Sequence, residues 1–123
     1  MTRLSLFISV IILLFKIFCS NVFAAATFVD EYDASSDEKS ATGIAFNPDG
    51  TKMYVTGIGS DKILQYTLSV AFDVTSTVTL EQERNIASVD DAAEDVKFNS
   101  NGTVIFVVGT ENDAIYRWSL STP

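Results

Sequence analysis

Short runs of alternating hydrophobic and polar residues, each bounded by turn-forming residues, fill the chain after residue 40. In Lys62–Leu68, for example, Leu64, Tyr66 and Leu68 share one face and the residues between them occupy the other. This period-two alternation is typical of a half-buried strand. The runs predict strands at 43–46, 52–57, 62–68, 77–86, 96–98, 104–109 and 115–120. Only residues 91–96 contain good helix formers, and that segment is short and acidic, so we expect an all-β fold.

The strand pattern repeats at a fixed offset. Residues 46–51 (FNPDGT) return as residues 98–103 (FNSNGT), 52 positions later and without a gap. Tyr66 is replaced by Trp118 at the equivalent position, which indicates a shared aromatic packing position. Fixed-period self-similarity is typical of propellers, solenoids and arrays. Further residues return at the same offset: Val55 and Gly57 as Val107 and Gly109, Asp61 and Ile63 as Asp113 and Ile115, Leu68 and Ser69 as Leu120 and Ser121.

Residues 53–57 (MYVTG) follow a Pro-Asp-Gly-Thr turn and resemble the repeat of YVTN-type β-propellers, within the broader group of NHL and lactonase-like propellers. The resemblance covers roughly residues 27–123. It implies four-stranded blades packed around a channel. The chain departs from the family pattern at its final asparagine, where Gly57 and Gly109 stand instead. The matched motif is structural, and family members range from surface-layer modules and periplasmic binding proteins to lactonases and oxidoreductases, so the resemblance assigns no functional residue.

We expect the chain to divide into a leader at 1–24, which is described below, and a propeller repeat region at 25–123. Within that region we expect an orphan fourth strand at 27–33, a first blade at 43–86 and a second blade at 95–120 that lacks its fourth strand. Closed propellers use about four to eight blades. We therefore expect the chain to be the N-terminal fragment of a longer propeller. The alternative is a short protein whose copies assemble into a ring.

The leader has the layout of a secretory signal peptide. Arg3 precedes an apolar stretch at 4–15, and residues 22–24 (VFA) form a cleavage site before Ala25. Lys16 interrupts the apolar stretch well short of the ~20 residues that span a bilayer. These features predict a secreted or periplasmic protein. Retention of the leader as a membrane anchor is the alternative.

Composition limits the chemistry that the chain can perform. The net charge is −8, and removal of the leader takes away two cations, which disfavours nucleic acids and anionic membrane surfaces as partners. The chain has no histidine, and its one cysteine, Cys19, lies in the leader. We therefore assign no catalytic, cofactor-binding or metal-binding residues, and whether the chain is an enzyme stays open. The acidic segments 37–38 and 90–95 are typical of solvated loops, although their oxygens suit Ca²⁺.

These observations favour a secreted, non-catalytic β-propeller module that binds a protein, a glycan or a surface. One alternative is a fragment of an exported propeller hydrolase resembling a lactonase. Another is a repeat of a surface layer. Two isolated blades would expose apolar faces and unpaired strand edges, so self-association through blade edges is also expected.

Overall fold

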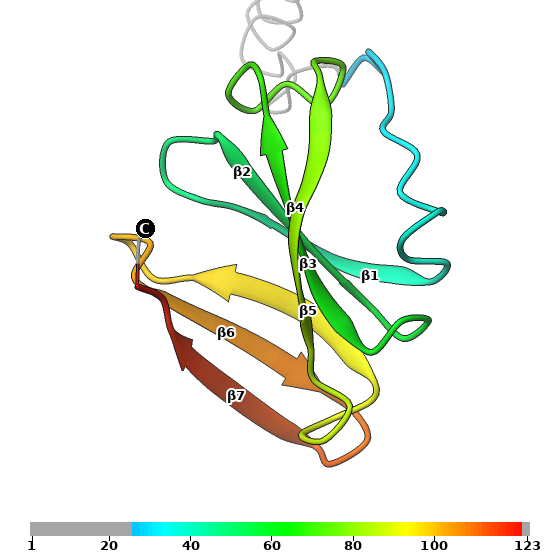
Figure 1. The fold of residues 1–123 in the computed structure, drawn as a ribbon, viewed down its shortest axis with the longest axis vertical. Helices are drawn as coiled ribbons and strands as arrows, with labels where there is room; N and C mark the ends of the chain where they lie inside the picture. Colours follow the sequence, from blue (N-terminus) through cyan, green and yellow to red (C-terminus); the bar gives the residue numbers. More distant parts are fainter. Residues whose placement is uncertain (1–25, 122–123) are drawn as a thin grey trace, which may run out of the picture.

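The computed structural model describes residues 26–121, which fold into two antiparallel β-sheets (Figure 1). The first sheet has four strands in the order β1-β2-β3-β4, and the second has three in the order β5-β6-β7. No helix occurs in the described part of the chain. The strands are β1 (Ala41–Phe46), β2 (Lys52–Gly57), β3 (Lys62–Leu68), β4 (Val78–Asn85), β5 (Ala93–Phe98), β6 (Val104–Gly109) and β7 (Ala114–Ser119).

The all-β prediction is confirmed, and β2, β3 and β6 have the bounds that the alternation predicts. The two sheets do not close into a ring. The strand expected at 27–33 is wrong for this structure, because those residues belong to neither sheet. Among the described residues, no strand pairs with them. The predicted leader at 1–24 lies outside the described residues.

The turn that recurs between β1 and β2 and between β5 and β6 is stabilised by the side chain of its asparagine, Asn47 or Asn99. Asn47 Oδ1 accepts a hydrogen bond from the Lys52 backbone N–H at 2.9 Å, and Asn99 Oδ1 accepts one from the Val104 N–H at 3.0 Å. Each turn also contains a glycine with positive φ, 73° at Gly50 and 72° at Gly102, where a side chain would be strained. The same turn sequence therefore occurs in the β1–β2 and β5–β6 hairpins because both hairpins require the same backbone conformation.

The main core lies between the two sheets. Tyr54 and Ile63 of the first sheet pack against Val96, Ile105 and Val107 of the second, and all five side chains are buried. Ile86 and Ala93, from the connection between the sheets and the start of β5, complete this inter-sheet core. Burial of aliphatic and aromatic side chains of this size contributes about 1.5–3 kcal/mol each. The two sheets therefore form one packed unit.

The opposite face of the first sheet, which we call the capped face, carries a second cluster of buried residues: Met53, Val55, Leu64, Tyr66 and Leu68. No sheet covers it. The segment 26–40 runs along this side, away from the second sheet (Figure 1). Tyr32 from this segment stacks edge-on against Tyr66 with ring centroids 5.5 Å apart. The cap therefore comes from single side chains.

Candidate functional site

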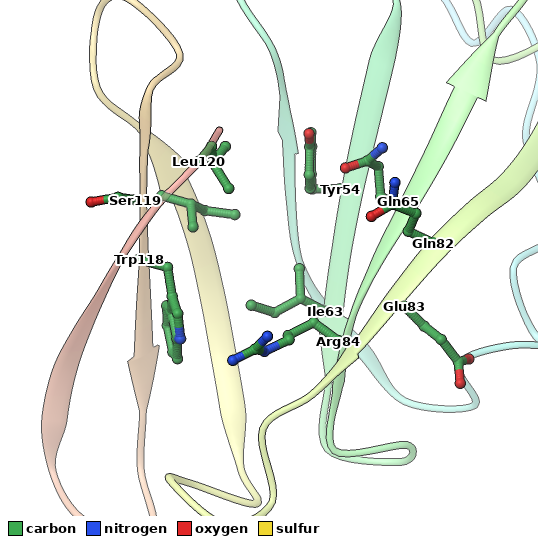
Figure 2. Close-up of a pocket in the computed structure, with 10 residues that line it drawn as sticks. Tyr54, Ile63, Gln65, Gln82, Glu83, Arg84, Trp118, Ser119 and Leu120 are labelled. Carbon is green, nitrogen blue, oxygen red and sulfur yellow. The ribbon is translucent and has the colours of Figure 1, made fainter. Parts of the chain in front are cut away.

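A cleft of about 380 Å³ opens between β4 of the first sheet and β7 of the second, and we call it the inter-sheet cleft (Figure 2). It exists because β4 has no counterpart in the second sheet, so the sheets diverge beyond the inter-sheet core. Its lining comes from β2, β3, β4, β6 and β7 and from the residue after β7: Tyr54, Ile63, Gln65, Gln82, Glu83, Arg84, Ile105, Trp118, Ser119 and Leu120.

The floor of the cleft is apolar and rigid. The Tyr54 ring packs edge-on against Phe98 with ring centroids 4.7 Å apart. Trp118 is only partly buried against the inter-sheet core, and its indole ring faces the cavity (Figure 2). Aromatic rings held in this way offer a large apolar surface to a ligand at little entropic cost.

The rim of the cleft is polar. Gln65 and Gln82 lie side by side across β3 and β4, and the Arg84 guanidinium reaches towards Trp118 (Figure 2). No ion pair or side-chain hydrogen bond joins Arg84 to another described residue, so its five N–H donors are available. Gln65 Nε2 donates to Glu81 Oε2 at 2.8 Å, which fixes the position of this amide.

The cleft is equipped for binding. Its lining carboxylate, Glu83, turns away from the cavity and pairs with Lys62 Nζ at 2.9 Å (Figure 2). The pKa of Tyr54 is raised by burial and by nearby Glu81, so its hydroxyl stays protonated at neutral pH. The chain has no imidazole to act as a base. An apolar floor, two amides and one unpaired cation suit an extended, partly apolar ligand that carries an anionic group.

Two buried carboxylates that we call the loop carboxylates, Glu38 and Asp90, brace the loop ahead of each sheet. Glu38 accepts backbone hydrogen bonds from Ser40, Gly59 and Ser60 at 2.7–3.1 Å. Asp90 stands 52 positions later and accepts equivalent bonds from the backbone N–H groups of Ala92, Glu111 and Asn112. Burial opposes ionisation of both groups, but the donors outweigh it and hold each pKa below its usual value.

The loop carboxylates also explain why a glycine ends both β2 and β6. A Cβ at Gly57 would lie 2.5 Å from Glu38 Cδ, and one at Gly109 would collide with the Asp90 carboxyl group. Only glycine leaves the room that each carboxylate occupies. The strand therefore ends in glycine because a buried side chain from the preceding loop packs against it.

The other acidic residues of these segments point to separate partners. Asp95 accepts from its neighbour Val96 N–H at 2.8 Å and from Lys97 Nζ at 3.1 Å. Asp37 accepts from the Tyr66 hydroxyl at 3.0 Å. Among residues 26–121, no group of three or more histidine, cysteine or acidic side chains is arranged to hold a metal ion. The oxygens considered for Ca²⁺ are therefore not gathered into one place.

Sequence reasoning did not find the inter-sheet cleft. The repeat predicts a packing position for Trp118, which also lines the cleft, and the sequence pattern assigns no role to Gln82 or Arg84. The one feature of the sequence that points to the cleft is the missing fourth strand of the second repeat, which leaves β7 without a described neighbour on the side where β4 lies in the first sheet. The loop carboxylates were named only as members of acidic segments, because a glutamate and an aspartate do not align as a repeat identity.

No protein-family model, no curated protein and no solved structure matches this chain. Within residues 26–121, no helix is both long and apolar enough to span a membrane.

Proposed function

We propose that this protein is an exported, non-catalytic binding module of the β-propeller type. It takes up an extended polypeptide segment along the outer edge of β7, with the side chains of that segment in the inter-sheet cleft. The observation that carries the proposal is the position of the cleft beside a strand whose outer edge has no partner among the described residues.

The outer edge of β7 is a template for strand addition. The Leu120 N–H donates to the Thr103 carbonyl at 2.8 Å, towards β6. Donors alternate in direction along an antiparallel strand, so the N–H groups of Ile115, Arg117 and Ser119 point outwards. A row of unpaired N–H and C=O groups binds extended peptides with sequence-independent hydrogen bonds, and adjacent pockets add specificity.

The chemistry of the cleft favours a peptide over a compact small molecule. A strand added beside β7 would turn every second side chain towards Trp118 and Arg84. An apolar side chain fits the aromatic floor, and an acidic one fits the Arg84 guanidinium. The leader-like residues 1–24 support export of the module, and the repeat and the turn network support a propeller blade as its building unit.

Selection from a library of heptapeptides on the immobilised protein tests this proposal. The protein is used at concentrations at which it is monomeric. Peptides with alternating apolar and acidic residues should bind saturably and shift the emission of Trp118, the only tryptophan in the chain. Binding should be lost in Arg117→Pro, which removes an outward-pointing N–H and leaves the β6 side of the strand intact.

Arg117→Ala is the matched control, because it removes the same side chain but keeps the backbone donor. It should retain the binding of neutral peptides. Peptide binding that is equal in Arg117→Pro and Arg117→Ala would overturn the proposal. So would the selection of no peptide together with a Trp118 response to oligosaccharides, which would make the cleft a glycan site.

A further inference from the structure

We infer that the segment bound at β7 is residues 27–33 of a second copy of this chain, so that copies join head to tail. The inference rests on the proposed function, because it names the partner of the same edge and cleft. In this arrangement the second copy also places its capped face against the outer face of the second sheet. We call that outer face, which contains Phe106, Val108 and Ile115, the open face.

The open face is the counterpart of a surface that is already an interface within the chain. Ile115 is 76% exposed, whereas Ile63, its equivalent in the first sheet, is 7% exposed against the second sheet. Phe106 is 37% exposed and its equivalent Tyr54 is 5% exposed. Each residue has the chemistry of an inter-sheet contact but lacks the sheet that would make it. The open face is thus suited to receive another sheet of the same kind.

The capped face is only partly covered, and it lies on the side of the first sheet away from the second sheet. Ile44 of β1 is 50% exposed, whereas its equivalent Val96 in β5 is 1% exposed beneath the first sheet. A second cavity, of about 360 Å³, remains between the cap and this face, beside Tyr32, Ile44 and Met53. The side chains of the cap therefore fill only part of the space that a sheet would fill. The open face of one copy has the residues to fill it.

The loop that follows residues 27–33 already has the shape it needs. The Ala34 carbonyl accepts hydrogen bonds from the N–H groups of Asp37 and Glu38, both at 2.9 Å. The Ile86 carbonyl, just after β4, accepts the equivalent bonds from Val89 and Asp90 at 2.7 and 2.9 Å. The connection from a fourth strand to the next sheet is thus preformed ahead of β1. Residues 27–33, which precede this connection, pair with no strand in the described part of the chain.

Residues 27–33 complement β7 in the register of the first sheet. There Gln65 lies opposite Gln82 and Tyr66 lies opposite Leu80. The 52-residue offset converts these pairs into Arg117 opposite Asp30 and Trp118 opposite Phe28. The first pair joins opposite charges, and the second brings two aromatic rings together at the cleft. Phe28 and Asp30 are both exposed in the single chain, and among the described residues Asp30 Oδ1 accepts a hydrogen bond only from the N–H of its neighbour Glu31, at 2.8 Å. Both side chains are therefore accessible to a second copy.

Copies that contact one another through two different faces form a closed ring when the rotation from each copy to the next adds up to a full turn. A ring with the usual four to eight blades would need about two to four copies of this two-sheet unit. Sedimentation velocity of the exported chain, with its N-terminus defined by intact mass, tests this directly. The mass should rise with concentration to a fixed multiple of the monomer. A monomer at every concentration would overturn the inference.

Ile115→Asp should abolish the association, because it places a charge in the centre of the open face. Ile58→Asp is the matched control: Ile58 is half-exposed in the β2–β3 turn and is not one of the residues that form the open face or the buried cluster of the capped face, so the variant should associate like the original chain. Equal association of the two variants would contradict the inference. Circular dichroism checks that both variants keep their sheets.

A charge exchange tests the strand register. Asp30→Arg and Arg117→Asp should each weaken association about tenfold through like-charge contacts, and the double variant should restore it. Weakening without rescue would refute the register. If the chain stays monomeric but still binds selected heptapeptides at β7, the second copy is excluded and the proposed function stands. If neither peptides nor copies bind, both proposals fall.

Discussion

Replacement of Glu38 by glutamine is the sharpest test of the physical account of the sheets. The carboxylate accepts four hydrogen bonds: Oε1 from the Ser40 and Gly59 N–H groups at 2.7 and 3.0 Å, and Oε2 from the Ser60 N–H and Oγ–H at 3.1 and 2.6 Å. Glutamine has the same shape but only one oxygen. Glu38→Gln therefore turns an acceptor into a donor without creating a cavity.

The cost follows from the donors that glutamine cannot satisfy. If the amide nitrogen takes the place of Oε2, the Ser60 N–H loses its acceptor while the Ser60 hydroxyl can rotate. The other orientation leaves two backbone N–H groups unpaired. One lost hydrogen bond to a charged group costs about 1.5–3 kcal/mol, and the remaining bonds weaken because they become neutral. We expect the free energy of unfolding to fall by about 2–4 kcal/mol.

Urea denaturation followed by Trp118 fluorescence and circular dichroism measures this loss. With a denaturant slope of about 2 kcal/mol/M, the middle of the usual range for urea, the midpoint should fall by about 1–2 M at unchanged slope. Glu83→Gln is the matched control, because Glu83 is exposed and pairs only with Lys62 among the described residues; such surface pairs contribute about 0–1 kcal/mol. If Glu38→Gln costs no more than this control, the bracing role of the loop carboxylates is refuted.

Three further outcomes follow from the same contacts. The free energy of unfolding should decline as the pH falls below the ordinary glutamate pKa of 4.5, because the lowered pKa of Glu38 stabilises the folded state only while the carboxyl group is ionised. Measured over an acid pH series, this decline should be smaller in Glu38→Gln, and an equal decline would contradict the prediction. Gly57→Ala should destabilise the protein by about 1–3 kcal/mol in urea, because the added methyl group meets the Ser40 carbonyl and the Glu38 side chain, and a neutral result would show that the loop has room to move. Asn99→Ala should lower the free energy of unfolding by about 1–3 kcal/mol in the same assay, because the Val104 N–H loses its side-chain acceptor. Ser100→Ala, an ordinary surface change, should lower it by less than about 0.5 kcal/mol.

The strands and their repeat were predictable because they depend on local information. Alternation defines β3 without reference to the rest of the chain, and the Asn-x-x-Gly turn carries its own hydrogen-bonding side chain. The offset of 52 residues then transfers each assignment from one sheet to the other. Even the glycines at 57 and 109 were visible, although the buried carboxylates that require them were not.

The candidate site was not predictable in the same way. The inter-sheet cleft depends on how far β4 and β7 stand apart, which no local pattern encodes. The segment 27–33 is predicted as a strand because it lies one 52-residue period before residues 79–85, but a strand forms only beside another strand. No described strand pairs with this segment, so the sequence pattern predicts a strand that the described structure does not contain.

Disulfide trapping between copies tests the head-to-tail account most directly. In the first sheet Lys62 lies opposite Asn85, so the proposed register places Ala114 of one copy opposite Asp33 of another. All chains carry Cys19→Ser, which leaves no other thiol. Chains with Ala114→Cys are mixed with chains that carry Asp33→Cys under mild oxidation, and Asp30→Cys replaces Asp33→Cys in the out-of-register control. Paired cysteines need Cα atoms within about 7 Å. The account predicts a covalent heterodimer for the first mixture and little for the control; equal yields in both mixtures, or no heterodimer in either, would contradict it.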